Sequence, residues 1–183
     1  MGPVVRGFLG RDLEIPDDRW YFVPDHLWVR DEGGGVYAVG LTEAGWLLCG
    51  GVRQADLLVA PGEPVEAGQT VCLLLTAKLK YLAAPLAGRV FAGDTVAGEI
   101  DPYGLPLFRV RTGSPDRSRL VDAVQYVRSL RDSEGIRNPG GATGPGSSIC
   151  KALYWGLRQQ RLDAEAGTSP QRHRTSTKRT LSK

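Results

Sequence analysis

Two lysines, Lys78 and Lys80, lie two residues apart in the apolar stretch 71–88. They are the only lysines before Lys151, and the other strongly basic residues in that range are arginines. A lysine amine can lose its proton and act as a nucleophile, whereas a guanidinium stays protonated. An amine at the tip of a hairpin with apolar arms is what a covalently attached cofactor requires. Two lysines can also cap an ordinary hairpin by chance, and the pair by itself does not decide between these readings.

Few other residues suggest chemistry. The cysteines Cys49, Cys72 and Cys150 are odd in number and scattered, which argues against a disulfide framework and a cysteine-based metal site. The histidines His26 and His173 form no zinc-binding pattern. No phosphate loop, catalytic triad or pair of carboxylates is recognisable. The sequence therefore favours a carrier or binding protein over an enzyme.

The composition also bears on compartment. No apolar run has the length of a transmembrane helix, and residues 1–7 lack the apolar region of a signal peptide. With cysteines that form no disulfide framework, this predicts a protein of the reducing cytoplasm with no membrane partner.

Charge changes sign along the chain. Residues 1–132 hold 14 basic and 17 acidic residues, which gives −3, and residues 133–183 hold 9 and 3, which gives +6. A basic tail could contact nucleic acid or an acidic partner, but this composition is more typical of a solvated, disordered end. The mildly acidic domain does not favour nucleic acid as a partner.

The sequence divides into four parts. Residues 1–19 are expected to be an extended lead-in, and 20–132 one domain of short strands with a C-terminal helix. Residues 133–148 are a Gly/Pro/Ser-rich linker by composition. Residues 149–183 form a basic, largely disordered tail, in which 149–164 could be a short amphipathic helix.

Short β-rich runs separated by glycine and proline predict a small sandwich or barrel. Strands are expected at 21–23, 27–30, 36–39, 54–60, 65–75, 88–92 and 107–111. The core candidates are Trp28, Val36, Val39, Leu57, Val71, Leu73, Val90 and Val110.

Two helices are expected. The first covers 41–49, with Thr42 as N-cap and Gly50 and Gly51 as the stop signal. The second covers 117–131, because apolar residues recur there at steps of three and four and would place one face on the sandwich. These apolar residues are Leu120, Ala123, Val124, Val127 and Leu130.

Several motifs between Asp25 and Val110 resemble, in their order, those of the glycine cleavage system H protein and its H-like relatives. They are 26–30 (HLWVR), 39–43 (VGLTE), 62–68 (GEPVEAG), 84–88 (APLAG) and 101–104 (DPYG) followed by 107–110 (LFRV). The motif DPYG is more typical of H-type proteins than of other lipoyl or biotin carriers.

The resemblance implies a fold and a function. The fold would be mainly β, a lipoyl-domain-like barrel-sandwich hybrid of two small sheets with a short internal helix and a C-terminal helix. The cofactor would be lipoate, attached covalently to a lysine at a hairpin tip by a lipoate-attaching enzyme. The carrier would pass an aminomethyl group among glycine decarboxylase, aminomethyltransferase and dihydrolipoamide dehydrogenase type enzymes without catalysing a step itself.

The attachment lysine follows from the register of that resemblance. In the family it lies eight residues before the proline of the APLAG-type motif, with an acid three residues before it. Ala77 occupies the nominal position here, and Lys78 lies seven residues before Pro85, with Leu75 where the acid would be. A one-residue deletion in the descending arm of the hairpin would bring Lys78 to the position of the family's lysine, whereas Lys80 would need a shift of three residues. Lys78 is therefore favoured, although a one-residue slip exchanges the faces of a strand.

Two alternatives stay open. A divergent H-like domain that is no longer lipoylated could act as a binding or scaffold module, and the missing acid and shortened hairpin favour it. A biotin carrier ranks lower, because no Met-Lys-Met sequence surrounds Lys78. His26, close to Trp28, is expected to be a structural or docking residue rather than a catalytic one.

Overall fold

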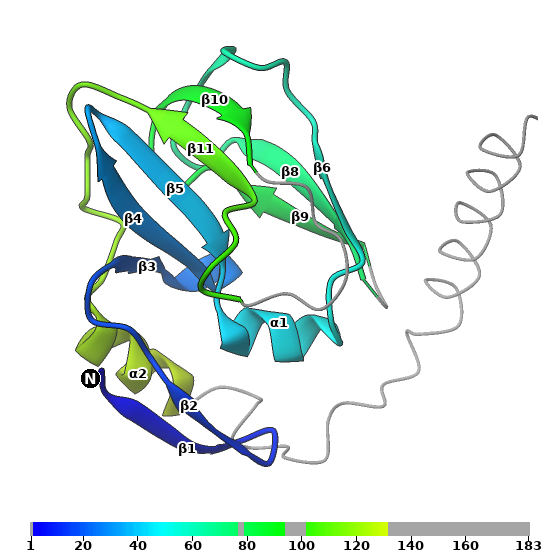
Figure 1. Ribbon diagram of the computed structural model, residues 1–183, viewed down its shortest axis with the longest axis vertical. Helices are drawn as coiled ribbons and strands as arrows, with labels where there is room; N and C mark the ends of the chain where they lie inside the picture. The colour runs from blue at the N-terminus through cyan, green and yellow to red at the C-terminus, as the bar shows by residue number, and fades with distance from the viewer. Residues whose placement is uncertain (1, 77–78, 94–101, 132–183) are drawn as a thin grey trace, which may run out of the picture.

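The computed structural model describes residues 2–76, 79–93 and 102–131 (Figure 1). The elements in chain order are β1 (Val4–Phe8), β2 (Arg11–Glu14), β3 (Trp20–Phe22), the 3-10 helix η1 (Val23–Asp25), β4 (Leu27–Gly33), β5 (Val36–Leu41), α1 (Glu43–Cys49), β6 (Gln54–Leu57), β7 (Pro64–Val65), β8 (Thr70–Leu75), β9 (Leu79–Ala83), β10 (Gly88–Ala92), β11 (Phe108–Arg111) and α2 (Ala123–Arg131).

Two antiparallel sheets share the main core. One has six strands in the order β3-β4-β5-β11-β10-β7, and the other has three in the order β6-β8-β9. Alternate residues of each strand point to the same side. Side chains of both sheets therefore meet between them, among them Val29, Val39 and Val110 of the large sheet and Leu74 and Leu82 of the small one. The expected fold class, a mainly β sandwich of two sheets with one internal and one C-terminal helix, is confirmed.

The lead-in predicted for residues 1–19 contains a structure of its own. β1 and β2 pair as an antiparallel hairpin, and its turn residues Leu9 and Gly10 both have positive φ, 47° and 77°. Phe8 and Leu13 are fully buried in a second core, which includes residues of α2. Because these apolar side chains need a surface to cover them, the hairpin packs beside α2 (Figure 1).

The first predicted helix is confirmed as α1. The Thr42 hydroxyl accepts a hydrogen bond from the Gly45 amide at 3.1 Å, and Gly50 ends the helix at φ 70°. Gly45 does not weaken the packing here, because a Cβ at that position would lie 2.8 Å from the Cβ of His26. The close approach of α1 to His26 therefore requires glycine.

The second predicted helix begins later than expected. Residues 117–122 are not helical, because Val121 exchanges two backbone hydrogen bonds with Tyr21, at 2.8 and 2.9 Å, and is held extended. Asp122 then accepts the Gln125 amide at 2.7 Å, and the helix starts at Ala123. Val124 is 52% exposed, so its predicted place on the buried face is wrong; Tyr126 is buried on that face instead.

The predicted core is largely correct, except that in β8 a different set of alternate residues points inward. Trp28, Val39, Val71, Val90 and Val110 are buried, whereas Val36, Leu57 and Leu73 are only half-buried. A bulge between Thr70 and Cys72 turns both Val71 and Cys72 inward. Because a bulge adds one residue to one strand, the alternation shifts and Leu74 is buried in place of Leu73.

The linker predicted at 133–148 and the tail at 149–183 lie outside the described residues. Within the described ranges, no helix is both long and apolar enough to span a membrane.

Candidate functional site: the lysine hairpin

The stretch that contains both lysines forms a hairpin of β8 and β9. Leu75 pairs with Leu79 in the last rung of the ladder, so residues 76–78 connect the two strands. The Thr76 side chain is buried, while Ala77 and Lys78 lie outside the described residues. The hairpin predicted around the lysines is confirmed, and Lys78 belongs to its three-residue connection.

Lys80 lies within β9 and not in the connection. It pairs with the buried Leu74 across the ladder and shares a strand face with the buried Leu82. Its Nζ lies 3.9 Å from Oδ1 of Asp25, with the two side chains 27% and 19% exposed. An amine in this position is partly enclosed and has an ionic partner, which suits a structural role better than an extended arm.

Asp25 is a residue that the sequence did not single out. Besides the contact with Lys80, its Oδ2 accepts a hydrogen bond from the Ala83 amide at 2.9 Å. One carboxylate thereby joins η1 to β9. The two contacts connect residues 55 and 58 positions apart along the chain, and no local pattern around Asp25 predicts contacts over that distance.

His26 follows η1 in the left-handed conformation, with φ 54°. Its Nδ1 lies 3.0 Å from the hydroxyl of Tyr126, which lies 2.8 Å from the hydroxyl of Thr42. Burial, with a smaller contribution from the charge of Lys80, lowers the pKa of His26 to about 4. A neutral imidazole in a hydrogen-bonded chain between α1 and α2 agrees with the structural role expected for it.

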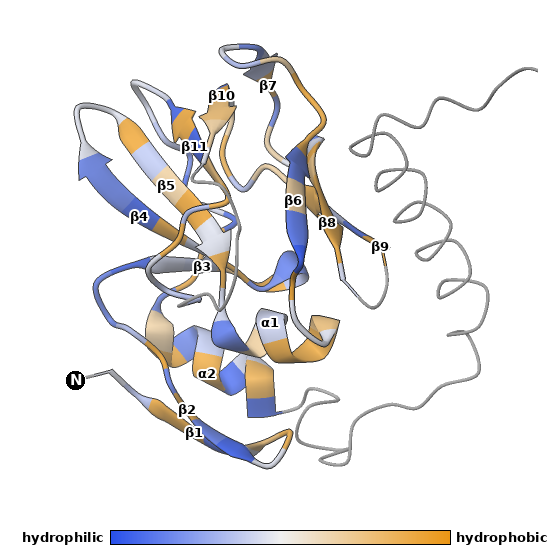
Figure 2. Cartoon of the chain, turned by 45° about the vertical axis from the view of Figure 1, so that its right-hand side comes forward, coloured by the Kyte–Doolittle hydropathy of each residue, from blue (hydrophilic) through white to orange (hydrophobic). Residues whose placement is uncertain are grey.

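The outer face of the hairpin is apolar. Leu73, Leu75, Leu79 and Tyr81, here called the hairpin outer face, form the cross-strand pairs Leu73–Tyr81 and Leu75–Leu79. Tyr81 is 58% exposed. Figure 2 shows the hydrophobic β8 beside a largely hydrophilic β6. Leu75, which stands where the resemblance implies an acid, therefore lies on an apolar surface beside the connection.

The described residues contain no group of three or more histidines, cysteines or acids that could hold a metal ion. Burial raises the pKa of the Cys72 thiol to about 12, which makes it a poor nucleophile. Neither observation therefore indicates a functional site other than the hairpin among the described residues.

The sheets and the hairpin define a lipoyl-domain-like β sandwich whose hairpin connection contains a lysine. Comparison with known proteins then gives the family. The chain is 34% identical to the glycine cleavage system H protein of Laribacter hongkongensis over 127 residues, which cover 63% of this chain and 97% of that protein. It is 32% identical to the H protein of Azoarcus sp. over 126 residues, covering 64% and 98%. The chain belongs to the family of glycine cleavage system H proteins.

Among solved structures, an H protein from Mycobacterium marinum is 26% identical, with a TM-score of 0.49, and the match covers 62% of this chain and 97% of that chain. No family model matches the chain.

Proposed function

We propose that this protein carries lipoate on Lys78 and shuttles an aminomethyl group between the partner enzymes of glycine cleavage. The observation that carries the proposal is the β8–β9 hairpin, because its three-residue connection contains Lys78 in a chain of the H protein family. The partners would be glycine decarboxylase, aminomethyltransferase and dihydrolipoamide dehydrogenase type enzymes, and the compartment the cytoplasm.

The residues of the hairpin fit a covalently attached arm. Strand pairing continues up to Leu75 and Leu79, so the attachment point stands on a hydrogen-bonded ladder. The contact of Lys80 with Asp25 leaves Lys78 as the better amine for an amide bond to the lipoate carboxyl group.

When bound, lipoate supplies dithiolane redox and group-transfer chemistry that side chains lack. The contribution of this chain is positioning. Asp25 holds β9 against η1 through the Ala83 amide, which keeps the hairpin in one orientation toward each partner. We therefore assign no catalytic residue to this chain.

A second function rests on the hairpin outer face. Without an acid at Leu75, an H-like domain that is never lipoylated could bind a partner through its apolar strands and act as a scaffold. Lys78 would then carry no cofactor.

The two functions are separated by intact-mass measurement and peptide mapping of the protein from its own lipoate-competent host. The carrier predicts one lipoyl increment on the peptide containing Lys78, lost in Lys78→Arg and kept in Lys80→Arg. Unmodified Lys78 in cells whose other lipoyl proteins are fully modified would contradict the carrier and favour the scaffold. An increment lost only in Lys80→Arg would show that the register is wrong.

A further inference from the structure

A group of arginines lies on the outer face of the six-stranded sheet, the side away from the main core. Val90 and Val110 are fully buried in that core, so their neighbours Arg89, Arg109 and Arg111 point outward. In β4, Arg30 follows the buried Val29 and shares this outward side. These four residues, Arg30, Arg89, Arg109 and Arg111, are here called the arginine face.

Strand register brings the four side chains close together. Arg89 lies directly opposite Arg111 in the β10–β11 ladder, and Arg30 and Arg109 flank Ala38 on its two sides. Like charges directly opposite each other destabilise a sheet. Such a pair is therefore better explained by an anionic partner than by the stability of the domain.

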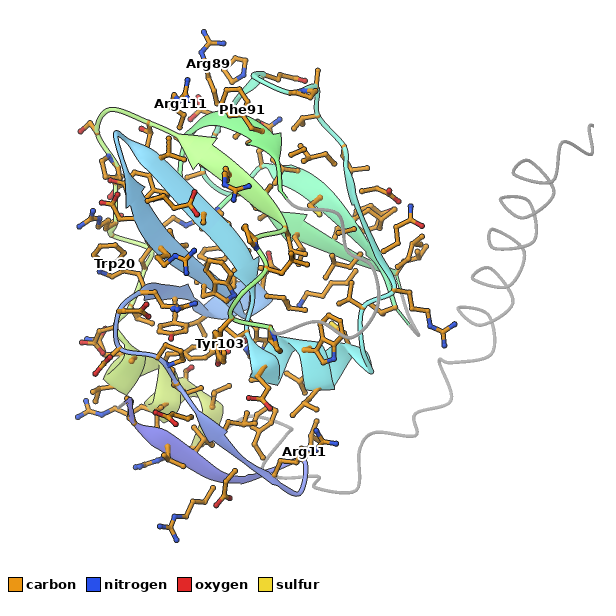
Figure 3. All side chains as sticks on the ribbon, viewed as in Figure 1. Arg11, Trp20, Arg89, Phe91, Tyr103 and Arg111 are labelled. Carbon is orange, nitrogen blue, oxygen red and sulfur yellow. The ribbon has the colours of Figure 1, made fainter. Side chains whose placement is uncertain are left out.

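Only part of this charge is balanced within the described residues. Glu32 contacts two members, with its oxygens 3.4 Å from Arg30 and 2.9 Å from Arg109. Arg89 and Arg111 are exposed and form no ion pair with a described residue. The excess positive charge thus lies on the paired strands β10 and β11, where Figure 3 labels Arg89, Phe91 and Arg111 close to one another.

The two exposed guanidinium groups are oriented by their surroundings. Arg89 donates from Nη1 to the Gly62 carbonyl at 2.9 Å, and the guanidinium carbon of Arg111 lies 5.2 Å from the centre of the Phe91 ring. A guanidinium has five N–H donors in a planar fork that matches a carboxylate with two parallel hydrogen bonds. Groups that are already oriented lose less freedom when they bind.

The surrounding charge favours an acidic protein over nucleic acid. Residues 1–132 carry a net charge of −3, so the positive charge of the arginine face is local and does not extend over the domain. Nucleic-acid affinity comes largely from the number of phosphates neutralised, and a protein that makes about 6–10 phosphate contacts uses more cations than the four of this face. A local positive surface on an acidic domain is suited to orienting a protein partner whose contact surface is rich in Asp and Glu.

We propose that the arginine face is a docking surface for an acidic segment of a partner protein, with Arg89 and Arg111 as its carboxylate-binding pair. The surface does not include the lysine hairpin. Its function therefore does not depend on whether Lys78 carries lipoate.

The test is an NMR titration of the full-length, ¹⁵N-labelled protein with a synthetic peptide of ten glutamates. Because signals are resolved by residue, binding to the basic tail is separated from binding to the sheet. We expect shifts in the amides of β10 and β11 and in the arginine Nε–H groups. In the double variant Arg89→Gln/Arg111→Gln, the affinity for the peptide measured from these signals should fall at least about tenfold.

Two further variants make the test specific. Arg6→Gln/Arg11→Gln removes the same charge from exposed residues of the β1–β2 hairpin and should change this affinity by less than about twofold. Arg89→Lys/Arg111→Lys keeps the charge but lacks the planar fork, and should bind several times more weakly than the natural protein.

Three outcomes would overturn the proposal. Shifts restricted to residues outside β10 and β11 would place the binding elsewhere. Equal affinities of the Arg89→Gln/Arg111→Gln variant and the natural protein would remove the two arginines from the interaction. If a single-stranded DNA of ten thymidines bound to β10 and β11 more tightly than the ten-glutamate peptide, the surface would be a nucleic-acid-binding one instead.

Discussion

At the scale of residues, the two lysines differ in surroundings although they are neighbours in sequence. Lys80 lies on the inward side of β9 beside Asp25, and Lys78 belongs to the connection. The resemblance to the H protein family ranked Lys78 first, by its distance from Pro85. The contact of Lys80 with Asp25 is an independent physical reason for the same ranking. An amine that is paired with a carboxylate inside the domain is less accessible to a lipoate-attaching enzyme.

The missing acid leads to a prediction at this scale. Leu75→Glu places a carboxylate on the hairpin outer face, where the side chain is only half-buried and can reach solvent. If the lipoate-attaching enzyme recognises an acid there, as the resemblance implies, the lipoylation rate should rise by about tenfold, the effect of one charge-assisted hydrogen bond. The measurement is the initial rate of lipoate incorporation with purified ligase.

Leu73→Glu is the matched control, because it adds the same charge to the same strand face two residues farther from the connection. Equal rates for Leu75→Glu and Leu73→Glu would show that net charge, and not position, matters to the enzyme.

At the scale of elements, the Tyr126 hydroxyl joins α2 to α1 and η1 through Thr42 and His26. Tyr126→Phe removes both contacts and leaves two enclosed polar groups with fewer partners. We expect the free energy of unfolding in urea to fall by about 1–3 kcal/mol. Tyr81→Phe, which removes the hydroxyl of a largely exposed tyrosine, should change it by less than about 0.5 kcal/mol. Similar losses in the two variants would contradict the linking role of Tyr126.

Elements with strong local signals were predicted correctly. Thr42 caps the N-terminus of α1 and Gly50 its C-terminus. The capping hydrogen bond and the left-handed conformation of Gly50 involve only nearby residues, so the sequence predicts them. α2 began late because Val121 pairs with Tyr21, which lies a hundred residues earlier. A backbone pairing over that distance overrides a helical pattern and leaves no local signal.

At the scale of the whole molecule, His26 links stability to pH. Its folded-state pKa of about 4 lies below the ordinary value of 6.5 in the unfolded chain. The unfolded state therefore binds more protons between these values, and stability falls as the pH drops from about 6.5 to 4. The difference between these two pKa values corresponds to at most about 3–4 kcal/mol of stability.

The variant His26→Asn tests this dependence, because asparagine tolerates the positive φ and does not titrate in that range. Urea unfolding at intervals from pH 4 to 7 should give a shallower slope for the variant than for the natural protein. Identical slopes would show that other groups cause the acid sensitivity.

The sequence by itself determined the β-rich fold class, the caps of α1, most of the eight core candidates and the apolar arms around the two lysines, because these features depend on short-range periodicity and capping. Only the tertiary structure decided the phase of β8, the contact of Asp25 with Lys80, and the assembly of the arginine face from β4, β10 and β11. Each of these depends on which strand lies beside which and in what register. Strand neighbours and register are set by packing of the whole domain, and no short segment of the chain contains that information.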